Sequence, residues 1–298
     1  MQLNNNDLYL LSQCAISAAL QAGQIINNYA HDKLTVNSKQ GGTSLASQVV
    51  TEVDLLSQAS ILQNLQASCA IYDLALLTEE SPDDLQRLEK DYFWCIDPLD
   101  GTLPFIEQTP GYSVSIALVA KNGTPYIGVI YDPVKQTLYQ AVKGGGALRN
   151  GKSWQAVPIS HSKSQSLFFI SDRSFAKHPQ YHAVQTQLAD IAKQLGYTDV
   201  QNIQQGGAAM NACWVLENAV ACYFKFPNQQ AGGGCLWDFA ASACLFNETK
   251  AVVSDIHGQA LDLNRADSTY MNQHGVLYAT DSLLAEQVKA LFIKLNPA

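Results

Sequence analysis

The sequence has few of the features that mark membrane, secreted or nucleic-acid-binding proteins. Its apolar runs all fall short of the roughly 18 residues that a membrane span needs. The segment Met1 to Asp7 lacks the basic and apolar regions of a signal peptide. Basic residues are scarce, 18 against 26 acidic ones, and the net charge is −8. We therefore expect neither a nucleic-acid polymer nor a membrane as partner, because both need a basic surface.

The cysteines also lack the spacing of thiol metal sites. The chain has seven of them, with no Cys-x-x-Cys, and most lie in apolar patterns. Small buried thiols of this kind are typical of proteins kept reduced in the cytosol, so we expect a cytoplasmic protein without thiol-bound zinc. The cysteines are Cys14, Cys69, Cys95, Cys213, Cys222, Cys235 and Cys244.

Two familiar catalytic patterns are incomplete. Gly144 to Gly146 is not followed by the Lys-Ser/Thr of a phosphate-binding loop, so it is interpreted as a turn. Ser113 and Ser115 alternate in a predicted strand without a Gly-x-Ser-x-Gly elbow, which disfavours a serine hydrolase. The composition, 47% hydrophobic and 15% charged, is that of a globular protein whose chemistry must come from other residues.

Hydrophobic periodicity predicts an α/β (α+β) protein. Apolar residues at helical spacing predict helices over about 7–29 and 51–67. From about 69 to 158 the period becomes that of strands joined by short turns, which predicts an antiparallel sheet. Beyond Ser160 strands and helices alternate, and Asp281 is expected to cap the last helix.

This change of texture also suggests how the chain is divided. At 298 residues it can hold one large domain or two modest ones that share a core. We expect an N-terminal α+β half, 1–160, with most of the acidic motifs, and a C-terminal α/β half, 161–298, with Asp238. The sequence shows no repeat and no low-complexity linker, so the halves should share an extensive interface.

Acidic residues stand at the ends of predicted strands and at the start of a helix. Asp97 and Asp100 follow an apolar run, the pair Glu79-Glu80 ends an earlier one, and Asp238 begins an Ala-rich helical pattern. Carboxylates without adjacent basic residues repel one another and resist burial. Hard divalent cations relieve that repulsion, and ligand sets made only of oxygen suit Mg²⁺. The expected ligands are Glu79, Asp97, Leu99 through its carbonyl, Asp100 and Asp238.

These segments resemble a known family. Asp97-Pro-Leu-Asp100-Gly-Thr102, preceded by Glu79-Glu80-Ser81 and followed by Trp237-Asp238, is similar to the motifs of the inositol monophosphatase superfamily. Its members are Mg²⁺-dependent, lithium-sensitive phosphatases, among them inositol monophosphatases and 3′(2′),5′-bisphosphate nucleotidases. The likeness runs from about Lys39 to about Ala279. It implies a layered αβαβα sandwich with the active site between the two halves.

The resemblance also implies roles for the metal ligands. Glu79, Asp97 and Leu99 would hold the ion that activates water. Asp97, Asp100 and Asp238 would hold the ion that faces the leaving group. Two Mg²⁺ ions are therefore implied, with a third left open.

Further roles follow from matching positions. Thr102 is implied to hydrogen-bond the attacking water, with Asp54 of Val50-Thr51-x-x-Asp54 behind it as proton acceptor. Glu79 is counted with these two as a catalytic residue. Gly101 and Thr102 begin a predicted turn or helix whose free amides would bind phosphate oxygens.

The alcohol part of the substrate is expected to meet a different set of residues. The segment Gly206 to Ala209 resembles the family segment that contacts that part, which implicates Gly207 and Ala208. Asp238 is expected to contact substrate as well as metal. Lys225 is the remaining candidate, either as the grip for a second phosphate or as a side chain that only covers apolar surface.

The sequence also departs from the family pattern. Gln48 stands where the family often has an acid, and Lys39 matches a family lysine only in general position. Asn211 replaces a lysine common in the nucleotidases, while Lys225 lies near the place of a glutamate in the inositol monophosphatases. Asn211 therefore disfavours a substrate with a second phosphate, whereas a cation at Lys225 favours an anionic substituent on the substrate. The long loop 227–234 is expected to reshape the pocket.

The leading hypothesis is a Mg²⁺-dependent phosphomonoesterase that hydrolyses a small phosphate ester with metal-activated water. Inositol monophosphate is the first substrate to test, and a 3′(2′),5′-bisphosphate nucleotidase is the alternative. A non-catalytic protein that binds a phosphate ligand is the remote alternative. The expected partner is a small-molecule phosphate ester, with a homodimer left open.

Overall fold

The computed structural model describes residues 2–30, 36–38, 49–156, 165–218 and 220–297. Its N-terminal elements are, in chain order, α1 (Asn5–Tyr29), β1 (Val36–Ser38), β2 (Val49–Thr51), α2 (Glu52–Tyr72), β3 (Ala75–Thr78), η2 (Gln86–Leu88), β4 (Tyr92–Asp100), α3 (Thr102–Ile106), β5 (Ser113–Ala120), β6 (Pro125–Asp132), β7 (Thr137–Val142), β8 (Gly146–Arg149) and β9 (Lys152–Trp154). The elements that follow are β10 (Ser166–Ile170), η4 (Arg173–Lys177), α4 (Tyr181–Gln194), β11 (Asp199–Ile203), α5 (Ala208–Glu217), β12 (Ala221–Lys225), α6 (Leu236–Thr249), β13 (Val252–Ser254), β14 (Val276–Ala279) and α7 (Ser282–Leu295).

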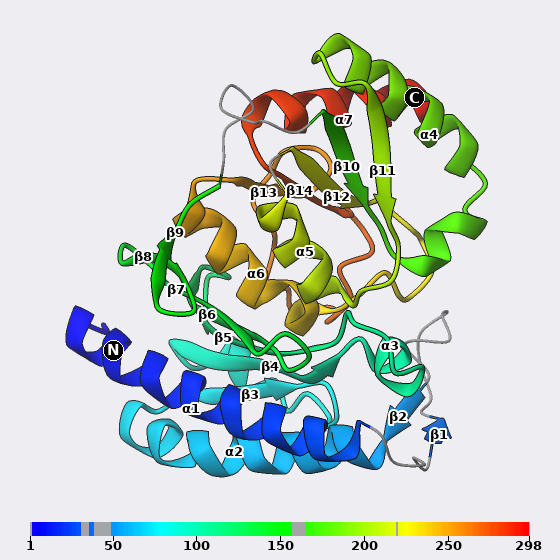
Figure 1. Cartoon of the computed structure of the whole chain (residues 1–298). Coiled ribbons are helices and arrows are strands. Elements are labelled where there is room, and N and C mark those ends of the chain that lie inside the picture. Colours follow the sequence, from blue (N-terminus) through cyan, green and yellow to red (C-terminus); the bar gives the residue numbers. More distant parts are fainter. Residues whose placement is uncertain (1, 31–35, 39–48, 157–164, 219, 298) are drawn as a thin grey trace.

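The elements stack as five alternating layers (Figure 1). Helices α1 and α2 cover one face of a seven-stranded sheet, and α5 and α6 cover its other face. The same two helices, α5 and α6, also contact a five-stranded sheet, whose outer face carries α4 and α7. The predicted αβαβα sandwich is therefore confirmed.

The larger sheet has the strand order β3-β4-β5-β6-β7-β8-β9. From β4 to β9 every neighbouring pair is antiparallel, as the short turns of the sequence predict. The edge strand β3 differs, because it runs parallel to β4. As a result Glu79, directly after β3, lies at the same end of the sheet as Asp97 and Asp100 near the end of β4.

The smaller sheet has the order β11-β10-β12-β14-β13 and mixes directions. Strand β10 is parallel to both β11 and β12, while β14 is antiparallel to β12 and β13. Asp281 caps α7, since its side chain accepts a hydrogen bond from the Leu284 N–H, as expected from the sequence.

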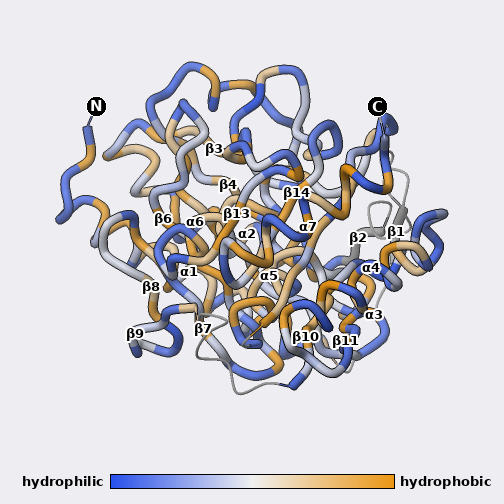
Figure 2. The backbone as a smooth tube through the Cα atoms, turned by 90° about the horizontal axis from the view of Figure 1, so that it is seen from above, coloured by the Kyte–Doolittle hydropathy of each residue, from blue (hydrophilic) through white to orange (hydrophobic). Residues whose placement is uncertain are grey.

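The middle layer forms a core that both sheets share. Most residues of α5 and α6 are buried, since these helices lie between the two sheets. Their side chains form one buried cluster with residues of both sheets, for example Phe93 and Tyr223. Figure 2 shows the apolar segments concentrated in this interior and the hydrophilic ones on outer loops.

The structure also bears on the cysteines and on the apolar helices. All seven cysteines are free thiols in the described part of the chain. Among the described residues, no helix is long and apolar enough to cross a membrane.

Candidate active site

Three carboxylates from distant parts of the sequence meet between the halves. One oxygen each from Asp97, Asp100 and Asp238 can be chosen so that all three lie within 4.8 Å of one another. Asp97 and Asp100 come from the end of β4, and Asp238 comes from the first turn of α6. The first two are almost fully buried, with 1% and 4% exposed surface. The sequence prediction that these three acids converge agrees with this geometry.

The end of β4 is shaped to turn both acids in the same direction. The antiparallel register with β5 shifts between Asp97 and Asp100, which marks an irregularity in the strand. The Asp97 carboxylate accepts a hydrogen bond from the Leu99 N–H at 3.0 Å. Ser57 of α2 donates a 2.7 Å hydrogen bond to the Pro98 carbonyl. These contacts fix the backbone of the Asp-Pro-Leu-Asp motif against α2.

Asp100 is held by the N-terminus of α5. Its two carboxylate oxygens accept hydrogen bonds from the N–H groups of Ala208 and Ala209, both at 2.9 Å. A helix N-terminus favours negative charge, so this contact stabilises the carboxylate. It also explains Gly207, because a Cβ there would lie 2.5 Å from the Asp100 oxygens.

The charge of Asp100 is nevertheless costly in this arrangement. Burial is the main reason that the pKa of its carboxyl lies well above the usual range, and the Asp238 charge adds to the shift. The N–H groups of Ala208 and Ala209 act in the opposite sense without cancelling it. A nearby cation would remove this penalty.

Asp238 is fixed by the start of its own helix. Its carboxylate accepts a hydrogen bond from the Cys235 N–H in a capping box, so the side chain sits at the N-terminus of α6. Ser115 of β5 donates a 3.1 Å hydrogen bond to the Trp237 carbonyl and ties this turn to the larger sheet. The rigid sheet thus positions an acid that is far away in the sequence.

Glu79 lies beside this cluster. Its N–H donates to the Ile96 carbonyl at 3.2 Å, which continues the parallel pairing of β3 and β4. Its charge contributes to the raised pKa of Asp100, as a minor cause after burial and Asp238. Gln58 of α2 supports the neighbouring turn, because its amide oxygen accepts hydrogen bonds from the Thr78 hydroxyl and the Glu80 N–H. Within the described part of the chain, the group of three carboxylates within 4.8 Å consists of Asp97, Asp100 and Asp238 and does not include Glu79.

Thr102 and Asp54 form a buried polar pair next to the carboxylates. The Thr102 hydroxyl lies 3.2 Å from Asp54 Oδ1 and 3.4 Å from the Leu99 carbonyl oxygen. Thr102 is the first residue of α3, directly after Gly101 in a left-handed conformation (φ 87°), and Asp54 lies in the first turn of α2. The family resemblance implied that these two side chains lie together; their catalytic roles stay predictions.

The donors in this site fit Mg²⁺. The three clustered carboxylates are oxygen ligands that repel one another; Asp97 and Asp100 are buried and Asp238 is partly buried. The Leu99 carbonyl oxygen lies 3.4 Å from the Thr102 hydroxyl beside them. Burial, followed by the Asp238 charge, raises the pKa of Asp100, so the ionised carboxylate is unfavourable here without a nearby cation. A hard divalent cation supplies positive charge and suits these donors.

The glycines of the site allow its backbone segments to approach closely. A Cβ at Gly101 would lie 2.7 Å from the Gly111 carbonyl oxygen and 3.2 Å from the Gly207 nitrogen. The Gly207 N–H donates to that same carbonyl at 2.7 Å. The chain segments after β4, before β5 and before α5 are thereby joined at the expected substrate side of the carboxylates.

Lys225 lies at the end of β12, and a residue that the sequence analysis missed accompanies it. Its ammonium forms an ion pair with Asp172, with 2.7 Å between Nζ and Oδ2, and donates to the Gly233 carbonyl at 3.0 Å. Asp172 directly follows the strand Ser166–Ile170 and Ser171, much as Asp97 belongs to the end of β4. The sequence signal that could have indicated Asp172 is therefore an acid shortly after a predicted strand. The sequence alone could not indicate which cation it meets.

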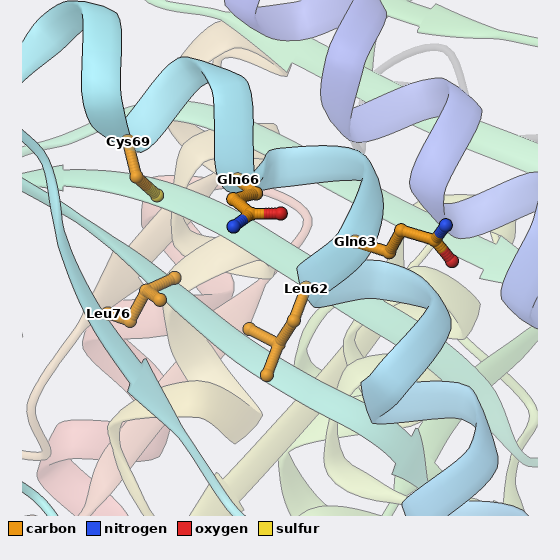
Figure 3. Close-up of a pocket in the computed structure, with 5 residues that line it drawn as sticks. All are labelled: Leu62, Gln63, Gln66, Cys69 and Leu76. Atoms are coloured by element: carbon orange, nitrogen blue, oxygen red, sulfur yellow. The ribbon is translucent and has the colours of Figure 1, made fainter.

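Other features lie away from this chemistry or outside the described residues. A cavity of about 320 Å³ between α2 and β3 is lined by Leu62, Gln63, Gln66, Cys69 and Leu76 (Figure 3). Its lining is apolar and amide side chains with one thiol, so it does not resemble a metal site. Lys39 and Gln48 lie outside the described residues.

The sequence matches a known family and individual known proteins. The model of the inositol monophosphatase family matches residues 7–294. The Nus factor SuhB of Escherichia coli (strain K12) is 31% identical over 244 residues, which cover 82% of this chain and 84% of that protein.

Solved structures share the fold. The inositol monophosphatase from Anabaena (Nostoc) sp. PCC 7120 has a TM-score of 0.70 and 23% identity, covering 97% of this chain and 98% of that one. An IMPase/NADP phosphatase described as complexed with Mg²⁺ and phosphate has a TM-score of 0.71 and 21% identity, covering 98% and 97%. Since the family model spans nearly the whole sequence, this chain belongs to the inositol monophosphatase family.

Proposed function

We propose that this protein is a Mg²⁺-dependent phosphomonoesterase for a small phosphate ester, with inositol monophosphate as the first substrate. The observation that carries the proposal is the meeting of Asp97, Asp100 and Asp238 within 4.8 Å, beside the hydrogen-bonded pair Thr102 and Asp54. Family membership supports a phosphatase. A structural neighbour described with Mg²⁺ and phosphate supports the choice of ion for that fold.

The residues proposed to hold two Mg²⁺ ions are Glu79, Asp97, Leu99 through its carbonyl, Asp100 and Asp238. When bound, the ions would neutralise charge on the phosphoryl oxygens, activate water and stabilise the leaving oxygen. The protein would hold these ligands in place before the ions bind, because the amides of α5 fix Asp100 and the first turn of α6 fixes Asp238.

Thr102 and Asp54 would provide the path for the proton of the attacking water. The Thr102 hydroxyl donates to Asp54, so its oxygen can accept a hydrogen bond from a water on its other side. As the water oxygen bonds to phosphorus and the bond between phosphorus and the ester oxygen breaks, the water proton would pass to Thr102 Oγ1 while the hydroxyl proton passes to the Asp54 carboxylate. The ester oxygen would leave as the alkoxide of the substrate alcohol and take a proton from solvent. Glu79 would hold the same water from the side of β3.

The substrate contacts belong to the same proposal. Backbone N–H groups of Gly101 and Thr102 would bind phosphoryl oxygens at the start of α3. Gly207, Ala208 and Asp238 would border the alcohol part, and Lys225, which is paired with Asp172, would contact it as well. We also propose a cytoplasmic location, consistent with the free thiols, and a division of function between halves 1–160 and 161–298.

A substrate panel tests the proposal. Phosphate release is measured with Mg²⁺ from inositol monophosphate, adenosine 3′,5′-bisphosphate and fructose 1,6-bisphosphate, with Asp97→Asn as the inactive control. We expect release from inositol monophosphate at the highest kcat/KM. Release from none of the three would overturn the proposed activity, and a higher kcat/KM for adenosine bisphosphate would favour the nucleotidase.

A role that does not depend on catalysis is the second candidate. The observation in its favour is the 31% identity to a relative named a Nus factor. The test introduces wild type and Asp97→Asn into Escherichia coli lacking SuhB. Restored growth by both variants would support this role, restoration by wild type alone would attribute it to catalysis, and failure of both would remove the candidate.

A further inference from the structure

Asp172 connects three elements at one side of the active site. Its Oδ1 accepts hydrogen bonds from the Tyr223 hydroxyl at 3.0 Å and from the Asn211 side-chain amide at 3.2 Å. Its Oδ2 lies 2.7 Å from Lys225 Nζ. The acid therefore has fixed partners on α5 and β12, and its position is not that of a mobile surface carboxylate.

The positive charge of Lys225 is compensated in this arrangement. Its ammonium is paired with Asp172, donates to the Gly233 carbonyl, and lies 5.3 Å from the centre of the Phe239 ring. The Lys225 side chain is 17% exposed and that of Asp172 is 27% exposed, so solvent reaches both. A ligand at this place would meet a neutral pair that offers both a donor and an acceptor.

The pair lies close to the clustered carboxylates. Asn211 belongs to the first turn of α5, the helix whose leading amides hold Asp100. Phe239, under the Lys225 ammonium, is the residue after Asp238. The electrostatics of Lys225 also indicate that the acids are near. Burial lowers the pKa of Lys225, but the charges of Asp172, Asp238 and Asp100 have the larger effect and raise the pKa above its usual value.

We propose that the Asp172–Lys225 ion pair sets substrate specificity by masking the lysine charge, which favours a phosphomonoester of a neutral polyol over a bisphosphate. This inference rests on the proposed phosphomonoesterase function and narrows its substrate class. Hydroxyl groups can both donate to Asp172 and accept from Lys225. A second phosphate at the same place would be repelled by the Asp172 carboxylate and would have to break an existing ion pair.

The test compares kcat/KM for adenosine 3′,5′-bisphosphate with kcat/KM for inositol monophosphate, as a ratio, in variants of the full chain with Mg²⁺. Asp172→Asn keeps an oxygen acceptor for Tyr223 and Asn211 but unmasks the lysine charge. We expect the ratio to rise about 10-fold or more, the effect of one charge-assisted hydrogen bond. Lys225→Met should lower the ratio, and the double variant should return it toward the wild-type value.

Glu217→Gln is the matched control. Glu217, like Asp172, pairs with a cation, Arg149, and accepts a hydrogen bond from a tyrosine hydroxyl, that of Tyr139. It is the last residue of α5, whereas the Asp172 contact is in the first turn. We expect Glu217→Gln to leave the substrate ratio unchanged.

The outcomes separate this inference from the function on which it rests. If wild type releases no phosphate from any substrate, the proposed function fails and the inference fails with it. If wild type is active but Asp172→Asn changes both substrates equally, or wild type prefers the bisphosphate, only the inference is overturned. If Asp172→Asn does not fold, Lys225→Met decides: a lower ratio supports the inference and an equal loss for both substrates overturns it.

Discussion

Two acids in the first turn of α2 show how much the surroundings of a residue decide its chemistry. Glu52 is exposed, whereas Asp54 is 1% exposed and accepts a hydrogen bond from the Thr102 hydroxyl. Both acids are equally compatible with a helix start, where negative charge is favourable. Only Asp54 is placed to take a proton from a group at the carboxylate cluster.

The first prediction follows from this difference. Asp54→Asn keeps an oxygen that can accept the Thr102 hydrogen bond, but the amide cannot accept the proton. We expect kcat at saturating Mg²⁺ to fall about 10²- to 10⁴-fold, the usual contribution of a general base. Glu52→Gln is the control and should keep wild-type kcat. A loss of Mg²⁺ affinity with little change in saturated kcat would show that Asp54 serves the metal site instead.

The second prediction concerns Asp97, which is proposed to be a ligand of both Mg²⁺ ions. Asp97→Asn removes one negative charge from the cluster while the amide oxygen can still accept the Leu99 N–H. Loss of a partner that merely supports a metal ligand already costs about 10- to 100-fold, so turnover should fall by at least about 100-fold. Phosphate release and Mg²⁺ titration by calorimetry measure the two effects. Wild-type Mg²⁺ affinity in this variant would contradict its assignment as a ligand.

At the scale of elements, the start of α5 and the end of β4 depend on each other. The two amides that begin α5 hold Asp100, and the close approach leaves no room for a side chain at Gly207. Gly207 has a φ of −64°, which any residue adopts, so its requirement is steric and does not come from the backbone angle.

The third prediction tests this close approach. Gly207→Ala should push the N-terminus of α5 away from Asp100 and destabilise the fold by about 1–3 kcal/mol, the usual cost of overpacking. Mg²⁺ affinity should fall as well, because Asp100 loses its two amide partners. Thermal unfolding and Mg²⁺ titration measure both. Gly145→Ala, in the turn before β8, is the control and should retain the wild-type Mg²⁺ affinity.

The elements also show which parts of the structure the sequence could predict. Periodicity located α1 closely and placed the strands β3 to β9 in the correct region of the chain, because the apolar residues of these elements pack on buried cores. It predicted a shorter α2, which continues to Tyr72, where Ser68 accepts a hydrogen bond from the Trp94 indole. The parallel direction of β3 was not predicted, since it depends on pairing with β4 across a connection that has no strand pattern.

The residues of the candidate site also differ in how far the sequence could predict them. Asp97 and Asp100 could be found because carboxylates at the end of an apolar run are conspicuous in a sequence. Asp238 could be found because it begins a helical pattern within a segment that resembles the family motif. Asp172 has the same local signal as the first two, but its meaning comes from Lys225 and Tyr223, about fifty residues further along the chain. Contacts of this kind depend on how β10 and β12 pair in the smaller sheet, and local pattern does not specify that pairing.

At the scale of the whole molecule, the layers bring acids from both halves to one point. Asp97 and Asp100 lie on the larger sheet, while Asp238 lies on the middle layer of helices. Their mutual repulsion opposes the packing of these layers in the absence of a cation. A bound divalent ion should therefore stabilise the whole fold as well as permit turnover.

The fourth prediction is that chelation abolishes turnover and lowers the melting temperature, and that added Mg²⁺ restores both. At a Mg²⁺ concentration about 100 times Kd, binding to the folded state alone would add about 2.7 kcal/mol to the free energy of unfolding. Asp238→Asn should lose most of this gain, because the acid from the middle layer then no longer joins the two on the sheet. The resemblance to lithium-sensitive phosphatases predicts that millimolar Li⁺ inhibits the Mg²⁺-restored activity. Full activity in excess chelator, or a melting temperature that does not respond to Mg²⁺ in wild type, would contradict the view that metal ions join the layers and carry the chemistry.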